Sequence, residues 1–144
     1  MRIWQKPISI EELTAKNTGS ASDHLGIEFT EVGDDFIGAR LKVERKTMQP
    51  YGRLHGGVSV VLAETLGSCG AYYACPAEFL ALGMEINANH LKGVSSGYVY
   101  GVARPFHVGK STQIWGIELK NDKHELICIS RLTVAIVQST SSPR

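Results

Sequence analysis

Apolar residues in the first third of the chain recur at every second position, which is the pattern of a strand with one buried face. Ile27 and Phe29 alternate with polar neighbours, and the same alternation returns over 37–43 after a polar turn at 33–35. The pattern predicts a hairpin of two half-buried strands.

Two helices are predicted around this hairpin. Ser9 and Glu12 have the spacing of a capping box, which predicts a short helix over about 10–16. The segment 57–74 consists almost entirely of small and apolar residues and predicts one long helix that ends before Pro76. Because this helix is apolar nearly all round, we expect it to be buried.

Alternation returns in the second half of the chain. Leu82, Met84, Ile86 and Ala88 occupy every second position, which predicts that they share one face of a strand with His90. Four strands are expected after the long helix, over about 82–92, 97–106, 111–121 and 125–137.

The order of these elements predicts an α+β fold, in which a six-stranded antiparallel sheet wraps around one long central helix, with a short helix near the N-terminus. One helix cannot cover both faces and both edges of such a sheet, so we expect the chain to oligomerise. A chain of 144 residues fits a single domain, expected over 1–138, and the polar end at 139–144 is expected to be a disordered tail.

Composition narrows the class of protein. Lys and Arg number 15 against 14 Asp and Glu, which argues against a strongly basic nucleic-acid binder. The chain has no apolar run long enough to span a membrane and no signal-peptide core near its start, so we expect a cytoplasmic protein. Three cysteines without CxxC spacing predict reduced thiols, and five histidines without ligand spacing predict no metal site.

Glu64 is the most informative residue, because it is the only charged side chain in the apolar segment 57–74. A carboxylate on a buried helix is costly unless it is paired or used. It is therefore either a core carboxylate bonded to a backbone group or an arginine, or a catalytic acid. Ser68 follows one turn later and either orients this carboxylate or is simply small.

His55, Gly56 and Gly57 form the entrance to the same helix. The two glycines either satisfy a positive φ or a close approach, or they leave a backbone N–H free to stabilise an oxyanion at the positive end of the helix dipole. His55 would line such a site. Gln49 either hydrogen-bonds a substrate or lies in solvent as an ordinary loop residue.

The strand at 82–92 also carries polar residues. Asn87 and Asn89 share a face and are typical of the solvent side of a sheet. His90 shares the opposite, apolar face, where a histidine is more often a satisfied core residue than a ligand.

Three segments together resemble the hotdog-fold acyl-CoA thioesterases. They are MQPYGRLHGGVSVVLAETLGS (48–68), GMEINANHLK (83–92) and SRLTVAIV (130–137). The most similar group is the phenylacetate-type and 1,4-dihydroxy-2-naphthoyl-CoA hydrolases, over about residues 3–137. The resemblance implies a homodimer that joins two sheets and forms the active sites at its interface, and usually a homotetramer of two such dimers.

The resemblance also implies roles for individual residues. Glu64 matches the family's catalytic carboxylate and Gly56 the backbone donor to the thioester oxygen. Gln49 matches the glutamine that places the carbonyl or the water, and His55 the adjacent histidine. The residues implied in substrate binding are Ser68, His90 and Gly57. Glu64 would come from one protomer, and Gln49, His55 and Gly56 from the other.

The resemblance implies hydrolysis of an acyl-CoA, and more narrowly of an aroyl-CoA such as 1,4-dihydroxy-2-naphthoyl-CoA. It implies no cofactor, because coenzyme A is part of the substrate. Glu64 would act as general base or as nucleophile. Two alternatives stay open: a hotdog dehydratase or hydratase that pairs Glu64 with His55 or His90, and a non-catalytic acyl-CoA-binding protein. Two interpretations are possible for the aromatic residues: they line a pocket for an aromatic acyl group, or they belong to the ordinary packing of the core. These residues are Tyr51, Tyr72, Tyr73, Phe79 and Trp115.

Overall fold

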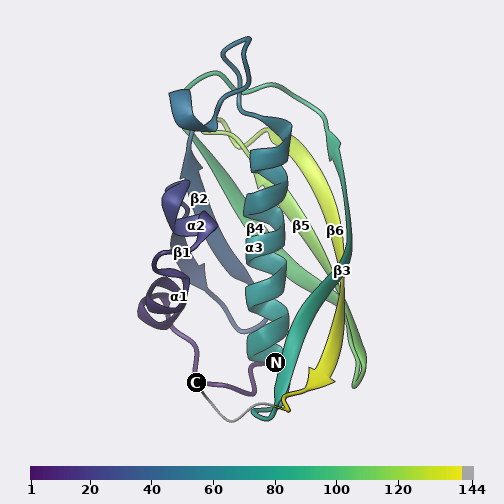
Figure 1. Ribbon diagram of the computed structural model, residues 1–144. Helices are drawn as coiled ribbons and strands as arrows, with labels where there is room; N and C mark the ends of the chain where they lie inside the picture. Colours follow the sequence, from purple (N-terminus) through teal and green to yellow (C-terminus); the bar gives the residue numbers. More distant parts are fainter. Residues whose placement is uncertain (141–144) are drawn as a thin grey trace.

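The computed structural model describes residues 1–140 and shows one long helix lying across a strongly curved antiparallel sheet (Figure 1). The helices are α1 (Ile10–Asn17), α2 (Ala21–His24) and α3 (Gly56–Ala74), with a 3-10 turn at Arg45–Thr47. The strands are β1 (Glu28–Val32), β2 (Ile37–Lys42), β3 (Phe79–His90), β4 (Tyr98–Val108), β5 (Thr112–Lys120) and β6 (Leu126–Gln138). Their order in the sheet is β1-β2-β4-β5-β6-β3, which confirms the predicted α+β fold with its six strands and central helix.

The sequence prediction missed α2, a single turn of helix between α1 and β1. Ser20 caps it by accepting a hydrogen bond from the Asp23 N–H at 3.3 Å. Four residues are too few to show a helical period, so only the cap could have indicated this turn. At the other end of the chain, Ser139 donates to the Glu78 carbonyl at 2.8 Å, and the predicted tail otherwise lies mostly outside the described residues.

The small residues of α3 allow it to lie close to the sheet. A Cβ on Gly67 would come within 2.7 Å of the Leu132 side chain, and one on Gly70 within 2.6 Å of the Trp115 ring. Leu62 and Leu66 complete this buried side of the helix, and both are fully inaccessible to solvent. The run of small residues therefore reflects helix-to-sheet contact.

The opposite side of α3 is only half-buried, so the expectation of a helix buried on all sides is wrong for the single chain. Val60, Val61, Glu64 and Ser68 all lie on this half-exposed side, which α1 and α2 cover only in part (Figure 1). An apolar helix face left partly open is a surface that a second polypeptide can cover.

The N-terminal segment closes the C-terminal end of α3. The Lys6 ammonium donates to the Tyr72 and Phe79 carbonyls, at 2.9 Å in both cases, and lies 3.7 Å from the centre of the Tyr72 ring. A cation at this position satisfies free carbonyls and favours the negative end of the helix dipole.

Strand β3 starts three residues earlier than predicted and contains a β-bulge that changes which side chains share a face. Its register with β6 shifts between Gly83 and Glu85, so Met84 is the extra residue. Met84 is 68% exposed, whereas Ile86 and Ala88 pack on the core side. The prediction that Met84 shares a face with Ile86 is therefore wrong, because the bulge reverses the alternation.

No helix among residues 1–140 combines the length and the apolar character that crossing a membrane requires.

We expect Gly70→Ala to destabilise the protein. Alanine favours a helix interior over glycine by about 1 kcal/mol, but the added methyl group must displace the buried Trp115 ring, which typically costs about 1–3 kcal/mol. The net result should be a lower urea midpoint. Ser68→Ala, on the half-exposed side of the same helix, is the control and should leave the midpoint unchanged or slightly raised. A Gly70→Ala midpoint at or above that of the wild type would contradict the close contact.

Candidate functional site

The loop that leads into α3 is held rigidly by its own backbone. The His55 N–H donates to the Thr47 carbonyl at 2.9 Å, and Met48 and Leu54 form an isolated antiparallel bridge. At the tip, Gly52 has a φ of +79°, a conformation that favours glycine. These contacts fix the position of Gln49 at the start of the loop and of His55 at its end.

Gln49 lies half-buried in this loop with its amide orientation determined. Its Oε1 accepts a short hydrogen bond from the Tyr51 N–H. Because that backbone donor requires an oxygen, the other end of the amide is Nε2, which has no acceptor among residues 1–140 and can donate to a ligand. The predicted role of Gln49 in placing a carbonyl or a water is compatible with this orientation.

His55 is the N-cap residue of α3. Its Nδ1 accepts a hydrogen bond from the Gly57 N–H at 2.9 Å, so one of the free donors of the helix end is already satisfied. This leaves the exposed Nε2 side of the ring as the part of His55 that can meet a ligand. Sequence reasoning identified His55 but not its capping role.

Gly56 and Gly57 lie close to two histidine rings. Neither has a positive φ, so that interpretation is wrong for both. A Cβ on Gly56 would come within 3.0 Å of His90 Nε2, and one on Gly57 within 3.0 Å of the His55 ring. The Gly56 N–H has no hydrogen-bond acceptor among residues 1–140. It is therefore a free donor at the positive end of a helix of 19 residues.

Three of the predicted residues line one hollow of about 350 Å³: Gln49, Gly56 and His90. Leu54, Val94 and Ile127 form its apolar part, and Arg53 and Lys92 bring positive charge. Lys92 forms an ion pair with Glu125, and this ammonium holds the pKa of the carboxyl below its usual range. Arg53 has no ion pair within the described part of the chain.

Glu64 lies on the half-exposed side of α3 and has no hydrogen bond or ion pair to any described residue. Its Oε1 lies against Gly83 at the bulge of β3, where a Cβ would approach within 2.7 Å. The interpretation of Glu64 as a carboxylate bonded to a backbone group or an arginine is therefore wrong. Gly83 was missed, although an isolated glycine inside a strand indicates close approach of another group.

The structure does not bring Glu64 and Gly56 together within one chain. Glu64 and Ser68 line a second hollow, of about 360 Å³, that contains none of Gln49, Gly56 and His90. Eight residues of helix separate Glu64 from Gly56, a rise of about 12 Å. One chain alone therefore cannot apply both groups to the same bond.

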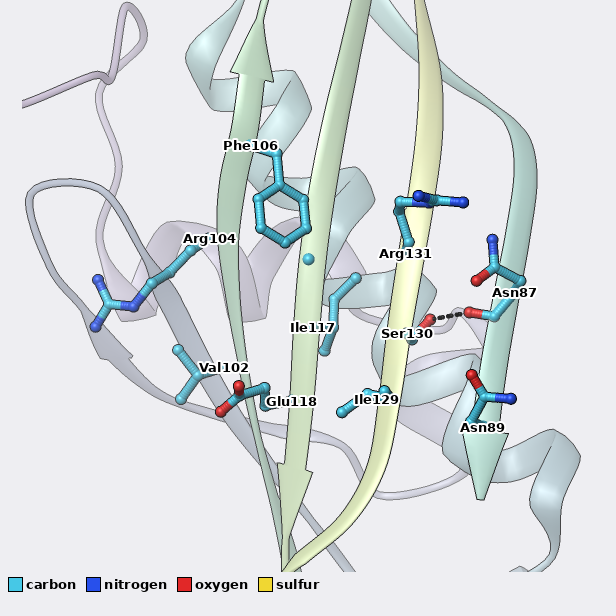
Figure 2. Close-up of a pocket in the computed structure, with 11 residues that line it drawn as sticks. Asn87, Asn89, Val102, Arg104, Phe106, Ile117, Glu118, Ile129, Ser130 and Arg131 are labelled. Atoms are coloured by element: carbon cyan, nitrogen blue, oxygen red, sulfur yellow. Dashed lines mark hydrogen bonds between the residues drawn. The ribbon is translucent and has the colours of Figure 1, made fainter. Parts of the chain in front are cut away.

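A further hollow, of about 570 Å³, lies on the face of the sheet away from α3 (Figure 2). Asn87, Asn89 and Arg131 point into this region, and the Ser130 hydroxyl donates to the Asn87 carbonyl at 2.8 Å. Both asparagines are exposed, as the sequence predicted for the solvent side of the sheet. None of the predicted site residues lines this hollow.

The aromatic side chains lie in different environments, although Tyr72 and Tyr73 pack edge to face with ring centres 5.1 Å apart. Trp115 is fully buried and stacks on Trp4 with ring centres 6.3 Å apart, whereas Tyr51 is 88% exposed. Tyr73 is buried, and its hydroxyl pKa is raised by burial and by the nearby Glu12 carboxylate. Core packing accounts for Trp115 and Tyr73, the buried members of this set. Among residues 1–140, no cluster of three His, Cys, Asp or Glu side chains is arranged to hold a metal ion.

Comparison with known proteins gives a consistent result. Residues 51–128 match the thioesterase superfamily. The chain is 44% identical over 135 residues to the 1,4-dihydroxy-2-naphthoyl-CoA hydrolase of Escherichia coli, which covers 94% of this chain and 99% of that protein. It is 42% identical to the proofreading thioesterase EntH of Cronobacter turicensis, over 94% of this chain and 98% of the relative. A crystal structure of a thioesterase from Haemophilus influenzae superposes with a TM-score of 0.94 at 40% identity, over 99% of both chains.

We expect His55→Ala to lower stability by about 1 kcal/mol, because it removes the side chain that caps α3. His55→Asn should retain most of that stability, since asparagine is a good N-cap residue. Thermal unfolding of the two variants measures the effect. Equal midpoints for wild type and His55→Ala would show that the cap contributes nothing.

Proposed function

The chain belongs to the thioesterase superfamily and hydrolyses acyl-CoA thioesters, and we propose that Glu64 is its catalytic carboxylate and the Gly56 N–H its oxyanion donor. The observation that carries this assignment is that both groups lack a partner among residues 1–140, although each lines a hollow. A carboxylate and an N–H without internal partners are available to a substrate.

In the reaction, the thioester oxygen accepts a hydrogen bond from the Gly56 N–H, which stabilises the negative charge that develops on it. One such donor contributes about 3–4 kcal/mol in other hydrolases. Ionised Glu64 either takes a proton from an attacking water or attacks the carbonyl carbon itself to form an anhydride that water then hydrolyses. In both routes the C–S bond breaks, coenzyme A leaves as a thiolate that is then protonated, and the free acid is released.

The active site is completed by a second copy of the chain in this proposal, with Glu64 from one protomer and Gln49, His55 and Gly56 from the other. The separation of the two hollows within one chain supports it. The position of Gly83 also supports it, because Glu64 contacts this glycine and Gly83 lies on β3, at the edge of the sheet. The exposed side chains of Leu82 and Met84 on this strand, 53% and 68% accessible, are suited to burial between two such edges.

We also propose that two such dimers form a homotetramer through the face of the sheet that α3 leaves uncovered. Phe106 is 75% exposed and Ile129 40% exposed beside the hollow of Figure 2. Burial of exposed apolar groups of this size is the usual driving force for association.

The remaining predicted residues have supporting roles in this scheme. The free Nε2 group of Gln49 donates to the carbonyl or to the water, and His90 forms the wall behind Gly56. Ser68 lines the same hollow as Glu64 and orients the carboxylate or its water. Gly57 lets the His55 ring lie against the helix start.

The proposed substrate is an aroyl-CoA, such as the 1,4-dihydroxy-2-naphthoyl-CoA named for the relative from Escherichia coli. Coenzyme A carries several phosphates, and Arg53, which lines the same hollow as Gly56 and has no ion pair among residues 1–140, supports recognition of that part. We propose that the enzyme works in the cytoplasm and needs neither a cofactor nor a metal.

Glu64→Gln should lower kcat by roughly 10²- to 10⁴-fold, because the amide can neither accept a proton nor attack the carbonyl. Substrate should still bind, since the side-chain shape is kept. Release of free thiol from benzoyl-CoA measures the rate, and Glu78→Gln, an exposed site, is the matched control. Near-normal turnover in Glu64→Gln would contradict the role of Glu64 as the catalytic carboxylate.

Gly56→Pro should lower kcat by roughly 10²- to 10³-fold, because it deletes the N–H that stabilises the oxyanion. Proline is tolerated at the first position of a helix. Gly56→Ala is the control, because it adds the same Cβ beside His90 but keeps the N–H.

Mixing the two inactive proteins, Glu64→Gln and Gly56→Pro, tests whether the site is shared. Exchange of subunits creates dimers in which one site has both native groups, so activity should return to roughly a quarter of the wild-type value. Activity that does not return although subunits exchange would contradict a site shared between protomers.

A further inference from the structure

The hollow beside Glu64 has a defined floor and a defined far wall. Val61, Glu64, Thr65, Ser68 and Cys69 of α3 form the floor. The wall comes from the N-terminal helices, through Asn17 at the end of α1 and Ala21 and Ser22 of α2. None of the N-terminal residues belongs to the segments in which sequence analysis found functional motifs.

The wall is attached firmly to the floor. The Ser22 and Thr65 hydroxyl oxygens are 2.7 Å apart and share a hydrogen bond, and Ser22 is only 9% exposed. Thr65 is the residue next to Glu64. The distance between α2 and the carboxylate is therefore held by a buried contact.

Asn17 lines this wall and also a neighbouring hollow of about 300 Å³, and its side chain carries an acceptor without a described donor. Its Nδ2 donates to the Leu13 carbonyl at 2.8 Å and also contacts Cys69 Sγ at 3.7 Å. Because a carbonyl can accept only from the amide nitrogen, the other end of the Asn17 side chain is Oδ1. No described residue donates a hydrogen bond to this Oδ1.

The dimensions of the hollow limit what it can receive. Glu64 and Cys69, beside which Asn17 lies, are five residues apart on α3, a rise of about 7.5 Å. This rise along the helix axis is comparable with the length of one substituted aromatic ring, and the hollow has a volume of about 360 Å³. Burial raises the pKa of the Cys69 thiol, so the thiol is neutral. Glu64 is then the only charged side chain that lines the hollow.

We propose that Asn17 determines which acyl group is hydrolysed, by accepting a hydrogen bond from a hydroxyl group on the far end of an aromatic acyl group whose thioester carbonyl lies at Glu64. This inference rests on the proposed function of Glu64. An acyl group without a hydroxyl leaves Oδ1 without a donor in a partly desolvated site, and sites built around such a bond discriminate against the analogue that lacks it.

The experiment compares 4-hydroxybenzoyl-CoA with benzoyl-CoA and with 4-methoxybenzoyl-CoA, which is similar in shape but has no donor. The wild type should show its highest kcat/KM with the hydroxylated substrate. Asn17→Ala should lower kcat/KM for 4-hydroxybenzoyl-CoA by roughly five- to tenfold, the equivalent of one hydrogen bond. It should leave kcat/KM for the other two substrates nearly unchanged.

Thr18→Ala is the matched control. Its hydroxyl also bonds a carbonyl of α1, that of Thr14 at 3.1 Å, but Thr18 does not line the hollow. It should alter no substrate preference. If Asn17→Ala lowers all three rates equally, or if the wild type prefers the methoxy compound, the assignment to Asn17 is overturned.

Binding provides a readout that does not depend on turnover. Calorimetric titration of the Glu64→Gln protein should show tighter binding of 4-hydroxybenzoyl-CoA than of benzoyl-CoA, and Asn17→Ala in the same background should remove the difference. A wild type that hydrolyses all three substrates without preference contradicts the role of Asn17 alone. A wild type that hydrolyses none of them contradicts the proposed function, so the two failures are distinguishable.

Discussion

The close contact between α3 and the sheet is the constraint on which the rest of the structure depends. Gly67 and Gly70 let the helix come down onto Leu132 and Trp115, and no larger residue would fit at either position without displacing them. This contact sets the height of the helix above β3. At that height the Glu64 carboxylate meets the strand at Gly83, a third glycine that makes room for it. Packing of the core and placement of the acid are thus decided by the same contact.

The two groups proposed to complete the site, the Glu64 carboxylate and the Gly56 N–H, have no partner among residues 1–140. A buried donor or acceptor is normally satisfied within its own chain. Among residues 1–140, the His55 ring satisfies the Gly57 N–H and the Gly56 N–H has no acceptor, while the Glu64 carboxylate lies against Gly83 without a hydrogen-bond or ion-pair partner. The helix dipole adds a favourable field for an anion at the free N–H. A chain that keeps a donor and an acid in two separate hollows is suited to combine them with those of a second copy.

The N-terminal segment helps to shape the surroundings of α3, although it carries no functional motif. Lys6 closes the C-terminal end of α3, and Ser22 attaches α2 beside Glu64 through Thr65. The same segment supplies Asn17 to the wall of the hollow beside Glu64. In the proposed function the catalytic groups lie on α3 and its entrance loop, whereas the chain before β1 forms one wall of the hollow proposed for the acyl group. Variation in that segment is a route to different acyl groups with one mechanism.

The sequence by itself determined the class of the fold and identified the residues that are candidates for catalysis and binding. Alternation and the long apolar segment predicted six strands and a central helix, and a lone carboxylate at 64 after two glycines indicated a catalytic pair. These signals are local, because side-chain period and helix-end chemistry depend on near neighbours. The tertiary structure decided what depends on contacts between distant residues. It placed a bulge at Met84 that reversed the alternation, brought Gly56 beside the ring of His90, and brought Asn17 beside Cys69 at the hollow that Glu64 lines. No pattern along the chain specifies which atoms meet across 34 or 52 residues of sequence, because packing in three dimensions selects those pairs.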